Sequence, residues 1–328
     1  MKLGSLKEGG PDGTLIVVSR DLSFAVRTTG IAASLREALE DWERAEPLLA
    51  ALSDDLNDRK ARGAFALDVA ALAAPLPRAW EFLDGSAYLP HVARVRKARG
   101  AEVPDTFYTD PLMYQATSAG FLGPRDPIGV ASEDYGIDLE AEIVVITGEV
   151  PMAASPEQTG KAIRLVGLVN DVSLRALIPA ELKKGFGFLQ SKPRSALSPV
   201  FVTPDELGDV WQKAKLNLPM RTWLNGKWLG EAECGVDMQF GFDQLIAHAA
   251  KTRPLVAGTL VGSGTIANED TSRGASCLAE QRTVEKLRDG EPTTSFLKFG
   301  DKLRIEILDD DGKSVFGAIE QSVEQYKD

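Results

Sequence analysis

The stretch GIDLEAEIVVITG, residues 136–148, places three carboxylic acids at every second position: Asp138, Glu140 and Glu142. The residues around them are typical of a β-strand, in which side chains alternate between the two faces of a sheet. The three acids therefore share one face, and a valine and an isoleucine continue that face further along. A solvent-facing surface would not continue in this way, and carboxylates are rarely buried without a partner. We expect a core-facing strand whose open end, at Glu140 and Glu142, supports a cation. Asp138 is expected to be a supporting or turn residue at the strand entrance.

Composition narrows the class of protein. The chain has 328 residues, of which 44% are hydrophobic, enough for one large domain or two smaller ones. Its net charge of −11 argues against nucleic acid or an anionic membrane as the main partner. No stretch approaches the roughly 18–20 apolar residues that cross a bilayer, and the first residues lack the apolar core of a secretory signal. We therefore expect a cytoplasmic protein.

The chain contains two cysteines and two histidines. Cys234 and Cys277 have no metal-ligand spacing and are interpreted as reduced structural thiols. The histidines, His91 and His248, restrict any mechanism that needs an imidazole. His248 lies on an apolar helical face and is expected in the core or at an interface.

The pattern along the chain predicts two domains, a small N-terminal α/β domain over 1–78 and a larger, strand-rich domain over 79–328. Two paired strands are expected over 14–29, followed by a helix that begins at the N-cap Ser34 with Glu37 three residues on. The fold class is α+β, mainly β, and no nucleotide-binding glycine loop is present. The expected strands are 139–148, 161–170, 198–203, 215–224, 255–262 and 302–309, and further helices are expected over 84–99, 243–251 and 275–287.

Two further acids stand where chemistry is plausible. The apolar run in KAIRLVGLVNDVSLRAL, residues 161–177, ends at Asp171, and Asp110 precedes a proline in an aromatic setting. Each could simply cap a helix or form a turn. Taken together with Glu140 and Glu142, they would form an all-oxygen site that suits Mg²⁺, Mn²⁺ or Ca²⁺ better than Zn²⁺ or Cu²⁺.

From about residue 80 onward the chain resembles the fumarylacetoacetate hydrolase family. The matching segments are YTD (108–110), DLEAE (138–142), NDVSLR (170–175), the lysine of LQSKP (189–193), GSGTI (262–266) and the acid of GASCLAE (274–280). The resemblance implies a β-sandwich roll after a smaller N-terminal domain, usually as a homodimer. It also implies a divalent-metal enzyme acting on small anionic oxo acids or diketo acids.

The resemblance assigns roles to individual residues. It implies Asp110, Glu140, Glu142 and Asp171 as metal ligands, Lys192, Glu280 and Gln115 as catalytic residues, and Arg175, Thr265, Gly264 and Tyr114 as substrate-binding residues. A lysine can stabilise a developing oxyanion, and an arginine can hold a carboxylate by a two-pronged contact.

The sequence departs from the family at one position. Hydrolytic members have a histidine before the Ala-Thr that follows the first ligand aspartate, and this chain has Gln115 there. Glutamine can orient water but cannot take its proton at neutral pH. Three explanations stay open: Glu280 acts alone as the base, His91 folds back to the site, or the enzyme does not hydrolyse its substrate.

Three functions follow from these observations. The first is a hydrolase, using Mg²⁺ or else Ca²⁺ or Mn²⁺, that cleaves a C–C bond in a fumarylacetoacetate- or acylpyruvate-like diketo acid during aromatic amino-acid or aromatic-compound catabolism. The second is a decarboxylase, hydratase or tautomerase of a related oxo acid, which the missing histidine favours. The third is a catalytically inactive binding protein, against which the retained carboxylates argue.

Overall fold

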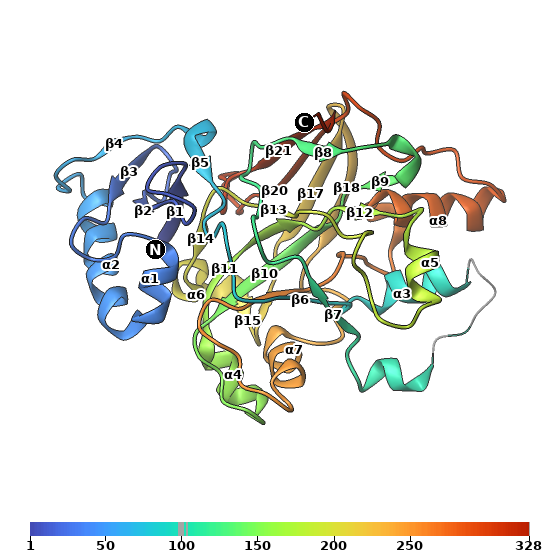
Figure 1. Ribbon diagram of the computed structural model, residues 1–328, viewed down its shortest axis with the longest axis horizontal. Helices are drawn as coiled ribbons and strands as arrows, with labels where there is room; N and C mark the ends of the chain where they lie inside the picture. The colour runs from blue at the N-terminus through green and yellow to red at the C-terminus, as the bar shows by residue number, and fades with distance from the viewer. Residues whose placement is uncertain (98–101, 103, 328) are drawn as a thin grey trace.

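A computed structural model describes residues 1–97, 102 and 104–327 (Figure 1). The last two residues of the helix expected over 84–99 lie outside the described residues. The described part is mainly β, as the sequence predicts, and no helix in it is long and apolar enough to cross a membrane.

Residues 1–78 form a layer of short strands with two helices packed against it, drawn in blue in Figure 1. The elements are β1 (Lys2–Leu6), β2 (Thr14–Val18), β3 (Phe24–Arg27), α1 (Leu35–Glu40), α2 (Trp42–Asn57), β4 (Phe65–Ala66) and β5 (Leu72–Ala73). The predicted N-cap is confirmed, because the Ser34 hydroxyl accepts a hydrogen bond from the Glu37 amide. The predicted single helix is instead two, since the chain leaves helical geometry at Asp41.

The main sheet of the described residues has twelve strands and runs through both parts of the chain. Its order is β4-β3-β2-β1-β14-β11-β10-β19-β6-β7, with β5 beside β1 and β13 beside β11. The later members are β6 (Phe82–Gly85), β7 (Met113–Ala116), β10 (Ala141–Thr147), β11 (Ile163–Asn170), β13 (Ala196–Leu197), β14 (Phe201–Val202) and β19 (Leu260–Gly262). Because β1 pairs with β14, the N-terminal strands extend the sheet that carries the site.

A second sheet of five strands in the described chain has the order β18-β17-β20-β21-β8. Its members are β8 (Ile128–Val130), β17 (Pro219–Leu224), β18 (Lys227–Glu233), β20 (Lys302–Ile307) and β21 (Ile319–Gln325). Two short pairs complete the strands: β9 (Ile137–Asp138) with β12 (Ser173–Leu174), and β15 (Trp211–Gln212) with β16 (Lys215–Leu216). β6 and β19 run parallel, as do β8 and β21, whereas the other pairs are antiparallel, so the sheets are mixed.

The remaining helices are α3 (Leu89–Lys97), α4 (Pro156–Ala162), α5 (Ile178–Leu182), α6 (Pro204–Leu207), α7 (Phe242–Ala249) and α8 (Leu278–Asp289), with 3₁₀ turns at Val69–Ala71, Asp105–Tyr108, Glu133–Tyr135, Gly208–Val210 and Thr271–Arg273. Of these helices, α3, α5 and α8 lie together at the right of Figure 1, and α4 and α7 lie at the bottom. α3 packs against α8, and α4 packs against α7.

Strand β10 is buried on both faces, which explains its continuous apolar run. Ile143 and Val145 belong to a core that also contains residues of the five-stranded sheet, such as Ile305. Val144 and Ile146 belong to a second core that includes apolar residues of α1 and α2. A strand covered on both faces reads as a near-continuous hydrophobic stretch, and the acids at its beginning are therefore carried into the interior.

Candidate active site

Three carboxylates from neighbouring strands meet in the interior. Asp84 lies in β6, Glu142 in β10, and Asp171 directly follows β11. All three are buried, and one oxygen of each lies within 4.8 Å of the others. Strand order brings them together, because β19 alone separates β6 from β10 and β11 lies on the other side of β10.

Two glycines make room for this cluster. Gly262 on β19 pairs with Asp84, and a Cβ at that position would collide with Oδ1 of Asp84. Gly264 has a φ of +78°, a left-handed conformation that favours glycine, and its amide donates to Oε2 of Glu142 at 3.1 Å. The predicted segment 262–266 thus contributes backbone space and a backbone donor.

Burial and the closeness of the carboxylates oppose ionisation of Asp84 and Glu142. Burial raises the pKa of Asp84 to about 7, and the charge of Asp171 adds to the effect. Burial and the neighbouring Asp84 likewise raise the pKa of Glu142. Oδ1 of Asp84 and Oε1 of Glu142 have no hydrogen-bond partner among the described residues. Hard oxygen donors with unused lone pairs, drawn from three strands, can hold a divalent cation.

Glu140 has a different environment, two residues before Glu142. Its Oε2 lies 2.7 Å from Nζ of Lys192, and its Oε1 accepts a hydrogen bond from Arg175. Burial opposes ionisation, but Arg175 and then Lys192 outweigh it and lower the pKa of Glu140 to about 2. Nζ of Lys192 also lies 2.7 Å from Oδ2 of Asp171. That same oxygen accepts a 2.5 Å hydrogen bond from the hydroxyl of Tyr114. The pKa of Lys192 is raised, because the charges of Asp171 and Glu140 outweigh its burial.

Asp138 supports the site from outside the cluster. Its two carboxylate oxygens accept hydrogen bonds from the backbone amides of Leu278 and Ala279, at 2.7 and 2.9 Å. These amides belong to the first turn of α8, where a carboxylate is favourable. Asp138 also accepts from Nε of Arg175 at 2.8 Å. Asp138, expected from the sequence to be a supporting residue, therefore holds both the start of α8 and the guanidinium of Arg175.

His91 and Glu280 form a dyad between α3 and α8. Nδ1 of His91 lies 2.6 Å from Oε2 of Glu280, and Nη1 of Arg94 lies 2.5 Å from the other carboxylate oxygen. Although burial opposes it, hydrogen bonding to His91 lowers the pKa of Glu280, with Arg94 adding to the effect. An ionised Glu280 favours the tautomer with hydrogen on Nδ1, which leaves Nε2 free to accept a proton.

The structure separates two of the predicted residues from the cluster. Asp110 is exposed and lies 3.4 Å from Nδ1 of His248, outside the carboxylate cluster. Gln115 is exposed, and its amide oxygen can accept from the guanidinium of Arg253 at 3.1–3.2 Å. The reason is strand alternation, because the neighbouring Tyr114 pairs with Asp84 and turns its hydroxyl toward the site. The other predicted site residues line the cavity at the carboxylate cluster or form hydrogen bonds to residues that line it.

Asp84 was not among the residues singled out from the sequence. It follows the apolar pair Phe82–Leu83 and precedes Gly85, the same pattern of a carboxylate at a buried strand end that drew attention to Asp171. This pattern is the sequence signal that marks Asp84.

The cluster lines an inner cavity of about 150 Å³. An outer cavity of about 950 Å³ adjoins it and shares His91, Arg175, Ile178 and Phe188. His91, one member of the dyad, therefore lines both the inner cavity and the wider outer cavity.

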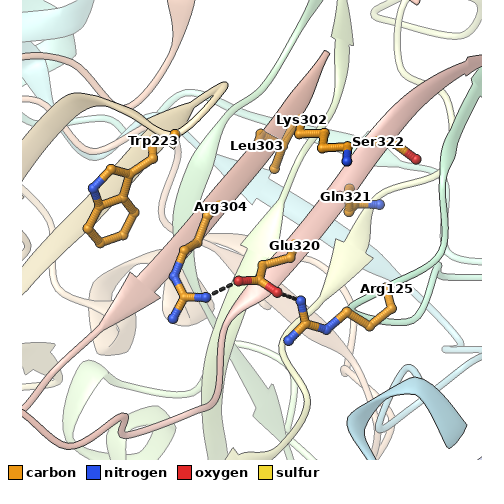
Figure 2. Close-up of a pocket in the computed structure, with 9 residues that line it drawn as sticks. Arg125, Trp223, Lys302, Leu303, Arg304, Glu320, Gln321 and Ser322 are labelled. Carbon is orange, nitrogen blue, oxygen red and sulfur yellow. Dashed lines mark hydrogen bonds and ion pairs between the residues drawn. The ribbon is translucent and has the colours of Figure 1, made fainter. Parts of the chain in front are cut away.

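A separate depression of about 650 Å³ lies over β20 and β21. Figure 2 shows Glu320 between Arg304 and Arg125, with Trp223 beside them. The carboxylate of Glu320 is already paired with two guanidinium groups. Among the described residues, no histidine lines this depression. This arrangement offers neither free metal ligands nor a base, so the inner cavity is the candidate active site.

The fold and site define a two-sheet protein with a buried carboxylate centre, and family models identify its class. The model described as fumarylacetoacetate (FAA) hydrolase C-terminal matches residues 82–324, and that of fumarylacetoacetase N-terminal domain 2 matches residues 1–78. The chain therefore belongs to the fumarylacetoacetate hydrolase family, a family of enzymes.

Two curated relatives match part of the chain. A 2,4-didehydro-3-deoxy-L-rhamnonate hydrolase of Sphingomonas sp. (strain SKA58) is 28% identical over 160 residues, covering 48% of this chain and 53% of that protein. An oxaloacetate tautomerase of Xenopus laevis is 28% identical over 160 residues, covering 48% of this chain and 47% of that protein. The match thus spans about half of the length of each relative.

Among solved structures, maleylpyruvate hydrolase from Sphingobium sp. SYK-6 has the same fold. Its TM-score is 0.67 with 18% identity, covering 99% of this chain and all of that chain. The same protein has been solved with manganese(II) ion and pyruvate, with a TM-score of 0.66, 17% identity and full coverage of both chains. The relatives include both a hydrolase and a tautomerase, so membership alone does not fix the reaction.

Proposed function

We propose that this protein is a divalent-metal-dependent hydrolase that cleaves a C–C bond in an acylpyruvate-like or fumarylacetoacetate-like diketo acid. The observation that carries the proposal is the His91–Glu280 dyad beside the buried carboxylates. It supplies the base that Gln115 cannot supply, and it removes the main reason for favouring a reaction without water activation.

We propose Asp84, Glu142 and Asp171 as ligands for Mg²⁺, Mn²⁺ or Ca²⁺, with Asp84 in place of Asp110. Support comes from the two unpartnered buried oxygens and the all-oxygen donor set. Glu140 can serve as a further ligand only if one of its carboxylate oxygens gives up its ion pair with Lys192 or Arg175. When bound, the cation would polarise a substrate carbonyl and stabilise negative charge on oxygen.

The residues around the cluster would then act on a diketo acid. With an acylpyruvate, His91 takes a proton from water, the resulting hydroxide adds to the distal carbonyl, and the C–C bond breaks to give a carboxylic acid and the enolate of pyruvate; with fumarylacetoacetate the same step gives fumarate and the enolate of acetoacetate. Protonation of the enolate carbon completes the reaction and balances the proton taken from water. Lys192 stabilises the negative oxygens, and Thr265 and Arg175 orient the substrate carboxylate, while the amide of Gly264 holds Glu142.

A second candidate is tautomerisation or decarboxylation of an oxo acid such as oxaloacetate. The relative from Xenopus laevis favours it, and the inner cavity of about 150 Å³ fits a small substrate. The same dyad could move a proton between carbon and oxygen without attack by water. Assembly as a homodimer and a place in aromatic catabolism also stay predictions.

The test is to incubate the protein and Mn²⁺ with acetylpyruvate or with oxaloacetate. Loss of diketo absorbance with equimolar pyruvate and acetate supports hydrolysis. Interconversion of the keto and enol forms of oxaloacetate, with acetylpyruvate unchanged, would replace the first proposal by the second.

A further inference from the structure

The segment between α5 and Lys192 contains a loop with little packing of its own. Phe186 is 99% exposed and Leu189 is 81% exposed. Gly185 and Gly187 flank Phe186 with φ angles of +74° and +90°, and neither has a neighbour within 4 Å of the position a Cβ would take. Apolar burial therefore does little to fix the tip of this loop, although Lys192 immediately beyond it is buried.

A single carboxylate, that of Glu181, binds the residues at the C-terminal end of this loop. Oε1 of Glu181 accepts hydrogen bonds from the amides of Leu189 and Gln190, at 3.1 and 2.8 Å. Oε2 accepts from the amide and hydroxyl of Ser191, at 3.2 and 2.5 Å. Burial opposes ionisation of Glu181, but the Ser191 hydroxyl and the backbone amides lower its pKa to about 2. Hydrogen bonds to an ionised acceptor are stronger than neutral ones.

These bonds end one residue before Lys192. The carbonyl of Ser191 accepts from the amide of Leu174, and the carbonyl of Lys192 accepts from the hydroxyl of Thr117 at 3.2 Å. The chain around Lys192 is therefore held by Glu181, Leu174 and Thr117. Glu181 accepts four of these hydrogen bonds, all from residues 189–191. From this backbone the side chain reaches Glu140 and Asp171, each at 2.7 Å.

We propose that Glu181 is a positioning residue that fixes the backbone at 189–191 and thereby aims the ammonium group of Lys192 at the reacting oxygens. The hydrogen bonds of Glu181 go to residues 189–191, and Glu181 does not line the inner cavity, so it acts through Lys192. The expected effect of Glu181 on the reaction rate rests on the function proposed above, whereas its effect on the position of Lys192 does not.

Glu285 in α8 provides a matched control. Its carboxylate also accepts two backbone amides and a hydroxyl, from Thr293 and Thr294, and these hydrogen bonds outweigh burial to lower its pKa to about 2. It therefore closes a loop by the same chemistry, but that loop does not lead to Lys192.

The experiment compares E181Q, E181A and E285Q with the wild type. We expect kcat to fall about 10²-fold in E181A, since displacement of a reacting group by about 1 Å costs that much. In E181Q we expect a loss of about tenfold, because one amide oxygen replaces two carboxylate oxygens as acceptor. KM should change little in both, and E285Q should keep the kcat of the wild type.

Crystal structures of metal-free E181Q and E181A provide a readout that does not need turnover. We expect Nζ of Lys192 to move away from Glu140 and Asp171. An Nζ that stays in place in both variants, or equal kcat for E181A and E285Q, would overturn the inference. Inactivity of the wild type would instead refute the proposed function and leave the crystallographic comparison to decide on Glu181.

Discussion

The imidazole of His91 lies 2.6 Å from the carboxylate of Glu280, although the two residues are 189 positions apart in the chain. α3 brings the histidine and the first turn of α8 brings the glutamate, and the contact of these helices creates the only dyad of this kind beside the inner cavity among the described residues.

Replacement of His91 by asparagine removes the proposed base without adding bulk. General base catalysis contributes typically 10²–10⁴-fold, so we expect kcat/KM for an acylpyruvate to fall by about that factor while Mn²⁺ binding stays unchanged. His248→Asn is the control, because His248 lies beside Asp110 outside the cluster. Full activity in His91→Asn would refute the dyad as the base.

Replacement of Asp84 by asparagine tests which aspartate completes the metal site. We expect Mn²⁺ affinity, measured by calorimetry, to fall by at least about 10–100-fold, because the neutral amide removes one of three anionic donors. Asp110→Asn should bind Mn²⁺ as the wild type does, since Asp110 is exposed and pairs with His248. The opposite result would restore Asp110 as a ligand.

Replacement of Lys192 by methionine removes the cation between two buried carboxylates. Loss of one partner of a buried ion pair costs about 3–5 kcal/mol, so we expect the free energy of unfolding of the metal-free protein in urea to fall by that order. Mn²⁺ should recover part of the loss, because it brings positive charge to the same carboxylates. Lys161→Met, at an exposed pair with Glu157, should leave the urea midpoint unchanged. An unchanged midpoint in Lys192→Met would contradict the structure.

Glu285 should contribute to stability in a pH-dependent manner. Its pKa is lowered from 4.5 to about 2 in the folded protein, because hydrogen bonds from Thr294 and its neighbours outweigh burial. Between these values the unfolded chain binds more protons, so the contribution of Glu285 is complete above about pH 4.5 and is lost as pH falls toward about 2. We expect the difference in unfolding free energy between the wild type and Glu285→Gln to shrink over this window. A difference that does not vary with pH would show that the carboxylate charge is not involved.

Much of the fold could be predicted from the sequence because it depends on local pattern. The apolar run at 143–146 identified a buried strand, and the family motifs identified the roll. Two of the longer strands, β18 and β21, are nevertheless not among those expected from the sequence. Both sequences mix polar and apolar residues, which weakens the apolar pattern.

The sequence also indicated the residue types of the candidate site, namely carboxylates at the ends of buried strands, together with Lys192 and Glu280 in later segments. Only the tertiary structure decided which carboxylates meet and which histidine lies against Glu280. Asp84 reaches the cluster because β6 lies beside β19, and Gln115 is turned away because strand neighbours face opposite sides. His91 reaches Glu280 through the packing of α3 on α8. These are contacts between distant segments, and they depend on strand order and helix packing, which the spacing of residues along one chain does not specify.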